Sequence, residues 1–103
     1  MSAARRKHGP RGTRHRSYKF SIIAGRADVA RLAEAFANSR TIAEFVIAPH
    51  DRDNTTAHLQ GYFRAPKGSK LTEREARARI EAAGFASYLI RVLPLVGRNA
   101  VEG

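Results

Sequence analysis

Residues 41–65 read TIAEFVIAPH, then DRDNTT, then AHLQGYFRA, and this stretch decides the fold. Its first segment, residues 41–50, is rich in β-branched and aromatic residues, which is typical of a strand. Residues 51–56 are all polar and prone to form a turn. Residues 57–65 alternate apolar and polar side chains, as a half-buried strand does. The stretch therefore predicts two antiparallel strands joined as a hairpin.

The segments on either side extend this hairpin into a sheet with helices. Their apolar spacing predicts, in order, a strand at 17–24, a helix at 26–39, a helix from Thr72 to Gly84, a strand at 85–93 and the start of a helix at 98–102. Thr72 with Glu75 makes a capping box, and Gly84 is a typical helix stop. The order β-α-β-β-α-β predicts an α+β, ferredoxin-like fold: a four-stranded antiparallel sheet with two helices on one face. The opposite face would be open to a ligand.

Positive charge is concentrated at the start of the chain. The 103 residues suit one domain, and 19 Lys and Arg against 9 Asp and Glu give a net charge of +10. Residues 1–16 contain six of these bases and no acid, which predicts a basic flexible arm ahead of a domain at 17–103. A polyanion such as nucleic acid is the natural partner. The chain has no cysteine and no apolar run long enough for a membrane span. We therefore expect no membrane partner and a cytoplasmic location; the oligomeric state stays open.

A cluster of possible metal ligands flanks the hairpin turn. The period of two in a strand places His58, Gln60 and Tyr62 on one face. The turn would bring His50 beside His58 and hold Asp53 above the same edge. Two imidazoles, a carboxylate and an amide oxygen suit Mn²⁺ or Mg²⁺ better than structural zinc. The same residues also fit an ordinary hairpin turn on a structural protein, and this alternative stays open.

Residues 50–53 (HDRD) followed by 58–62 (HLQGY) resemble the HUH endonuclease superfamily, the rolling-circle replication initiators (Rep) of plasmids and small single-stranded DNA viruses. The resemblance follows the element order from Tyr18 to the end of the chain and is specific over residues 50–63. It implies a nicking domain that binds single-stranded DNA at a replication origin together with a divalent ion, in the cytoplasm of a bacterial host or, for a virus, in the host nucleus. It also implies a ligand set, with Gln60 in place of the family's second histidine: His50, Asp53, His58 and Gln60.

The family cleaves DNA with a tyrosine on a helix after the fourth strand, which leaves a 5′-phosphotyrosyl link. Here the last tyrosine is Tyr88, which we expect in the fourth strand with its side chain packed. Tyr62 shares the metal face but belongs to the motif strand. Both are weak nucleophile candidates. The chain is therefore expected to be truncated before the nucleophile helix or to be an inactive, DNA-binding member, so its status as an enzyme stays uncertain.

Basic residues around the motif are candidates for DNA contacts. They are Arg5, Arg6, Lys7 and Arg11 of the arm, Lys19 of the first strand, and Arg64, Lys67 and Lys70 after the motif strand. The rival function is a non-catalytic single-stranded nucleic-acid binding module of the RNA-recognition type, which would stack bases on aromatic side chains of the open face. In such a module, Tyr18 and Phe20 of the first strand would be the rings that stack on bases. The third strand has Tyr62 beside the polar His58 and Gln60, which make a poor stacking surface.

Overall fold

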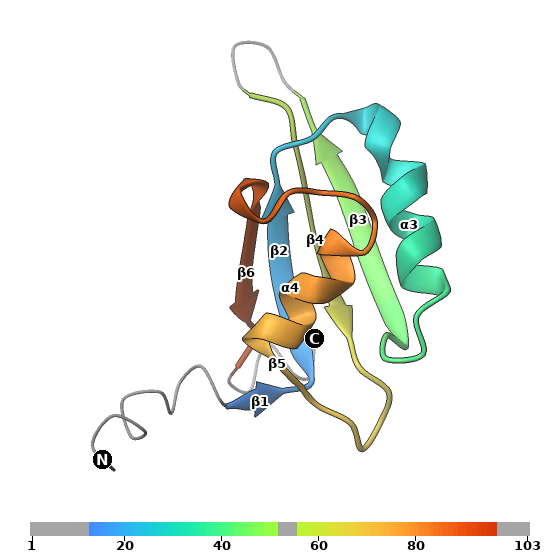
Figure 1. Ribbon diagram of the computed structural model, residues 1–103, viewed down its shortest axis with the longest axis vertical. Coiled ribbons are helices and arrows are strands. Elements are labelled where there is room, and N and C mark those ends of the chain that lie inside the picture. The colour runs from blue at the N-terminus through green and yellow to red at the C-terminus, as the bar shows by residue number, and fades with distance from the viewer. Residues whose placement is uncertain (1–12, 52–55, 97–103) are drawn as a thin grey trace, which may run out of the picture.

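A computed structural model describes residues 13–51 and 56–96. The strands are β1 (Arg14–His15), β2 (Ser17–Ile22), β3 (Glu44–His50), β4 (His58–Arg64), β5 (Leu71–Thr72) and β6 (Ile90–Pro94). The helices are α3 (Val29–Ala37) and α4 (Glu73–Glu81), with short 3₁₀ turns η1 (Arg26–Asp28) and η2 (Ser87–Leu89) (Figure 1). Neither helix of this described part is long and apolar enough to cross a membrane.

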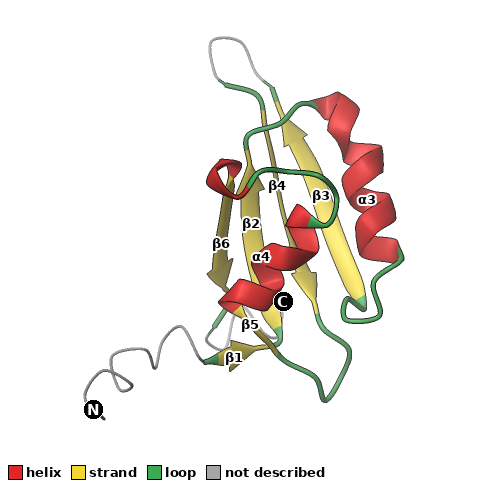
Figure 2. Cartoon of the chain, in the orientation of Figure 1, coloured by secondary structure: helices red, strands yellow, loops and turns green. Residues whose placement is uncertain are grey.

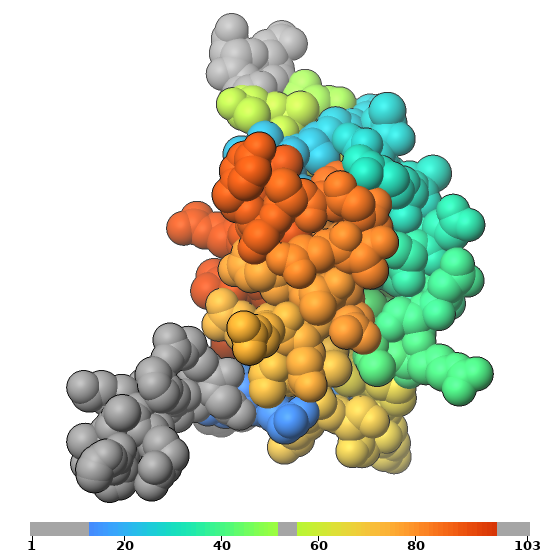
Figure 3. All heavy atoms as spheres, viewed as in Figure 1, coloured from blue at the N-terminus to red at the C-terminus, as the bar shows by residue number. Residues whose placement is uncertain are grey.

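The main sheet has the order β3-β4-β2-β6, and every neighbouring pair is antiparallel. Both helices lie on the same face of this sheet (Figure 2). In the space-filling view the side chains of α3 and α4, teal and orange, cover that face (Figure 3). The predicted α+β, ferredoxin-like arrangement is confirmed. The face away from the helices carries no described helix.

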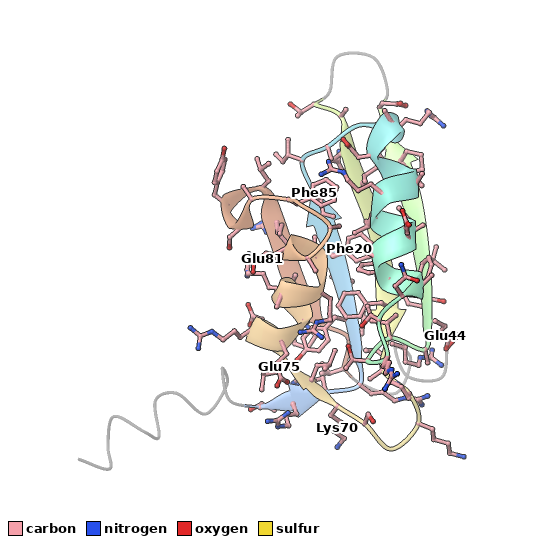
Figure 4. All side chains as sticks on the ribbon, turned by 45° about the vertical axis from the view of Figure 1, so that its right-hand side comes forward. Phe20, Glu44, Lys70, Glu75, Glu81 and Phe85 are labelled. Atoms are coloured by element: carbon pink, nitrogen blue, oxygen red, sulfur yellow. The ribbon has the colours of Figure 1, made fainter. Side chains whose placement is uncertain are left out.

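Aromatic side chains fill the space between the sheet and the helices. Phe36 of α3 is fully buried, and its ring centroid lies 5.7 Å from Phe20, 5.3 Å from Phe45 and 5.2 Å from Phe63. Figure 4 shows Phe20 in this position, under the helices. Because side chains alternate along a strand, burying Phe20 and Phe63 turns Lys19 and Tyr62 toward the open face.

The predicted start and stop signals of the second helix are confirmed. The Thr72 hydroxyl accepts a hydrogen bond from the Glu75 backbone N–H at 3.1 Å, and the Glu75 carboxylate accepts one from the Thr72 N–H at 2.8 Å. Helix α4 ends at Glu81, and Gly84 follows with a φ of +101°, in the left-handed region that glycine adopts without strain.

The fourth strand is shorter than predicted, and the expectation that Tyr88 is packed within it was wrong. Strand β6 begins at Ile90, and Tyr88 lies in the 3₁₀ turn before it with 87% of its surface exposed. The cause is the end of the neighbouring strand. Ile22 is the last residue of β2 and pairs with Ile90, so the segment before Ile90 has only one further ladder bond, from the Ile23 N–H to the Leu89 carbonyl.

Residues at the end of the expected arm belong to the fold. Arg14 pairs with Thr72 and His15 with Leu71, which makes a second, two-stranded sheet of β1 and β5. The Arg16 carbonyl accepts a hydrogen bond from the Ala65 N–H at 2.8 Å. The arm that the sequence predicted over 1–16 is therefore anchored from Arg14 onward. The predicted helix at 98–102 lies outside the described residues.

Candidate metal and nucleic-acid site on the open sheet face

The face of the main sheet turned away from the helices, here called the open face, carries polar and charged side chains in cross-strand rows. Strand register gives its rows as His50–His58, Ala48–Gln60–Ser21–Arg91, Val46–Tyr62–Lys19–Leu93 and Glu44–Arg64–Ser17. The row of His50 and His58 lies at the hairpin end of the sheet, and the row of Glu44 and Arg64 lies at the other end. The four strands therefore present one continuous surface.

His50 and His58 are direct cross-strand partners, as the hairpin predicted. Their ring centroids are 5.1 Å apart, and the ring planes differ by 18°. His50 is exposed and His58 is half-buried. The two imidazoles therefore form a stacked pair at the mouth of the hairpin.

A backbone carbonyl fixes the tautomer of His58. Its Nδ1 lies 3.1 Å from the carbonyl oxygen of Thr56. Because a carbonyl oxygen only accepts, Nδ1 carries the proton, and Nε2 of the neutral ring keeps its lone pair. Metal-ligating histidines commonly donate their other ring N–H to such a group. His58 is thus prepared to present Nε2 to a ligand.

The histidine pair fits a divalent ion after one ring rotation. Two cis imidazoles with metal–nitrogen bonds of about 2.1 Å have centroids roughly 4.5–5.3 Å apart, a range that includes the 5.1 Å separation of this pair. Two stacked imidazole rings cannot both direct a ring nitrogen at the same ion, so one ring must turn about its χ angles. The exposed His50 is free of the packing that would prevent this.

The other two predicted ligands differ in what the structure shows of them. Gln60 is half-buried on the open face, one row from the histidine pair. Asp53 lies outside the described residues. Asp51 bonds to Arg26 through both carboxylate oxygens at 3.2 Å. Within residues 13–51 and 56–96, no three His, Asp or Glu side chains converge so that they could hold an ion.

The middle of the open face holds a shallow cavity of about 250 Å³. It is lined by Lys19, Ser21, Gln60, Arg91 and Leu93, together with Phe20. Two cations thus flank an uncharged polar floor, next to the row of the histidine pair. Sequence analysis missed Ser21 and Arg91. The alternation of Arg91 with the apolar residues on either side of it was the available signal.

The predicted DNA-contacting residues separate into distinct places. Lys19 is exposed on the open face, whereas Arg64 is half-buried and bonds to Glu44 at 2.7 Å. Lys67 and Lys70 follow in the exposed loop after β4. Arg64 lies six residue steps after His58 along β4, a span of about 20 Å. The loop bases therefore lie at the opposite end of the sheet from the histidines. Four predicted contacts lie outside the described residues, namely Arg5, Arg6, Lys7 and Arg11.

The three tyrosines have different surroundings. Tyr18 is fully buried and donates a 2.6 Å hydrogen bond to the Leu71 carbonyl, and burial raises the pKa of its hydroxyl. Tyr62 is half-buried on the open face between Val46 and Lys19. Tyr88 lies toward the hairpin end, in the turn η2 just before β6, and β6 is two strand spacings from β4, or about 10 Å. No tyrosine of the chain is adjacent to the histidine pair in strand register.

No protein-family model matches this chain, and no curated protein matches it.

Proposed function

We propose that this domain binds single-stranded DNA and a divalent ion, Mn²⁺ or Mg²⁺, on its open face, as the nicking domain of a rolling-circle replication initiator does. The observation that carries the proposal is the cross-strand pair of His50 and His58, with Gln60 one row away on the same face. The resemblance of residues 50–53 and 58–62 to that superfamily gives this face its proposed task.

The residues around the pair have the chemistry that a DNA strand requires. Lys19 and Arg91 border the cavity next to Gln60, where they would neutralise phosphates. Ser21 and Gln60 offer uncharged donors and acceptors to sugar or base edges. The row of His50 and His58 is adjacent to the row of Gln60 and Ser21. A DNA strand that crosses the cavity would therefore reach the histidine pair next.

Within the proposal, His50, His58 and Gln60 would hold the ion, with Asp53 as the fourth ligand. The ion would supply Lewis-acid polarisation of a phosphodiester. The protein's own contribution is to orient Nε2 of His58 through the Thr56 carbonyl and to position the strand with Lys19 and Arg91. Nicking with a 5′-phosphotyrosyl product further requires a tyrosine that reaches the hairpin end of the open face.

The alternative is a non-catalytic module of the RNA-recognition type, and one observation weighs against it. Such modules stack bases on exposed aromatic side chains of the sheet. Tyr18 and Phe20, the aromatics of β2, are buried under the helices, with exposed fractions of 0% and 4%. Among the described residues the rows of the open face contain a single aromatic ring other than histidine, that of Tyr62.

The proposal is tested by measuring the affinity for a labelled oligo-dT strand by fluorescence anisotropy, in Mn²⁺ and in EDTA. We expect Mn²⁺ to tighten binding by the wild-type chain. His58→Ala should remove this increment and leave the affinity in EDTA unchanged. Lys19→Ala with Arg91→Ala should weaken binding in both conditions. Arg40→Ala removes an exposed charge from the loop between α3 and β3 and serves as the matched control.

Two results would contradict the proposal. Equal affinities for the strand in Mn²⁺ and in EDTA would show that no metal ion contributes to binding. Weakening by Arg40→Ala as large as that by the Lys19 and Arg91 changes would show a diffuse charge effect instead of a binding face. If the strand binds tightly without any response to Mn²⁺, the non-catalytic module is the better description.

A further inference from the structure

A second cavity lies at the end of the molecule opposite the histidine pair. It measures about 290 Å³ and is called here the basal cavity. It is formed where β1, the end of β4, the loop before β5 and the segment after β6 meet. The side chains that matter for its chemistry are Arg14, Arg16, Arg64, Lys70, Leu95 and Val96. Figure 4 shows Lys70 at this end of the molecule, below Glu75 and Glu44.

The basal cavity has an excess of positive charge. Its lining contains four cations. Two carboxylates partly neutralise them, because Glu75 bonds to Arg14 at 3.1 Å and Glu44 bonds to Arg64 at 2.7 Å. Four positive charges less two negative charges leave +2. Arg16 and Lys70 form no ion pair with the described residues.

Arg16 is held in place by the sheet. Its Nε donates a hydrogen bond of 2.9 Å to the carbonyl oxygen of Ala65, the residue after β4. The Ala65 N–H in turn donates to the Arg16 carbonyl at 2.8 Å, so backbone and side chain are fixed together. A guanidinium oriented through Nε retains two terminal nitrogens as a fork of donors. Such forks match the oxygen atoms of a phosphate.

Two features favour a nucleic-acid strand as the source of that phosphate. The basic segment of the sequence, with Arg5, Arg6, Lys7 and Arg11, joins the fold immediately before Arg14 at the cavity. The lining contains two apolar residues, Leu95 and Val96, which share the cavity with basic and polar residues. A lipid surface would instead be met by a continuous apolar face with bases along its border.

We infer that the basal cavity is a phosphate-binding site for a nucleic-acid backbone, with Arg16 and Lys70 as its main ligands. It lies about 20 Å from the histidine pair along β4. A strand held in the cavity would be fixed in register relative to the open face. The inference goes beyond the proposed function, because the cavity binds phosphate whether or not the histidines hold an ion.

The test measures oligo-dT binding in EDTA as a function of salt concentration, so that no metal contributes. For single strands the slope of log K against log salt is about −0.7 for each phosphate that the protein neutralises. Arg16→Ala combined with Lys70→Ala should therefore make the slope shallower by about 1.4. Arg40→Ala removes one positive charge from an exposed loop outside the cavity and should leave the slope unchanged. Lys70→Gln alone, at an exposed residue, should still change the slope by about 0.7 if the double variant unfolds.

Amide NMR spectra of the chain locate the bound strand. Oligo-dT in EDTA should shift the resonances of Arg16, Lys70 and Leu95. An unchanged slope in the cavity variants, or an equal change in Arg40→Ala, would overturn the inference. So would saturation of these shifts by inorganic phosphate with no further effect of oligo-dT, or binding to phosphatidylserine vesicles in place of DNA. Loss of the Mn²⁺ response in His58→Ala tests the proposed function separately.

Discussion

The imidazoles of His50 and His58 face each other across β3 and β4, with ring centroids 5.1 Å apart. Antiparallel register at the mouth of the hairpin creates this pair. The Thr56 carbonyl holds the Nδ1 proton of His58 and leaves Nε2 for a ligand. The pair therefore presents one oriented imidazole nitrogen beside a second, exposed imidazole.

Mn²⁺ should stabilise the folded chain through this pair. Binding to the folded state at a free concentration of about ten times Kd adds about 1.4 kcal/mol. In a domain of this size that free energy raises Tm by roughly 5–10 °C, as a thermal melt followed by circular dichroism would show. His58→Ala should remove the increase. His15→Ala, which deletes an imidazole at the far end, should retain it; a loss in both variants would point to non-specific effects of the ion.

Gly61→Ala should be strongly destabilising. A Cβ built at Gly61 would overlap with the carbonyl oxygen of Val46 and lie 3.1 Å from Cζ of Phe20. The first atom belongs to the backbone of β3, so the two strands would have to separate. We expect a loss of about 3 kcal/mol or more in the free energy of unfolding. Urea denaturation measures it, and Gly25→Ala, where nothing lies within 4 Å, is the matched control. Similar midpoints for the two variants would contradict the close approach.

Tyr18→Phe should also destabilise the fold, but less. The Tyr18 hydroxyl donates a buried hydrogen bond of 2.6 Å to the Leu71 carbonyl and so ties the main sheet to β5. Phenylalanine keeps the ring and leaves this carbonyl without its partner, at a cost of about 1–2 kcal/mol. Urea denaturation should show this loss. Tyr88→Phe, at an exposed hydroxyl, should leave the midpoint unchanged.

Two carboxylates make the fold sensitive to acid. The hydrogen bond from the Arg31 guanidinium lowers the pKa of Asp28, and the Thr72 N–H lowers the pKa of Glu75. A group with a depressed pKa in the folded state stabilises above its unfolded pKa, and this contribution is lost as the pH falls through the folded value. We therefore expect stability to decline below about pH 4.5, the ordinary pKa of a glutamate side chain. Glu75→Gln should flatten the decline; an unchanged pH profile of Tm would contradict the role of this carboxylate.

The chain should bind single-stranded DNA without forming a covalent adduct. Tyr18 is buried, Tyr62 is half-buried between neighbouring side chains, and Tyr88 is two strand spacings from the β4 histidine. A denaturing gel of the chain incubated with labelled DNA and Mn²⁺ should show free DNA alone. A band that resists denaturation would contradict this expectation. Its loss in Tyr88→Phe or in Tyr62→Phe would then identify the nucleophile.

Local patterns were sufficient for most of the secondary structure. The alternation in 57–65 and the capping box of Thr72 and Glu75 each depend on residues close in sequence, and both are present in the structure. The placement of Tyr88 was wrong because a strand continues only where a neighbour can pair with it. Strand β2 ends at Ile22, which pairs with Ile90, so β6 cannot extend back to Tyr88. The apolar alternation around Tyr88 contains no information about where β2 ends.

The sequence by itself determined the alternation of buried and open faces, the hairpin, and therefore the meeting of His50 and His58. Tertiary structure decided what lies beside them. It placed Arg91 next to Ser21, anchored Arg14 to Thr72, and gathered the bases of the basal cavity. Side-chain direction follows from a strand's own period of two, whereas the neighbour across a sheet follows from long-range register. That register is set by the packing of the whole core, which no local pattern contains.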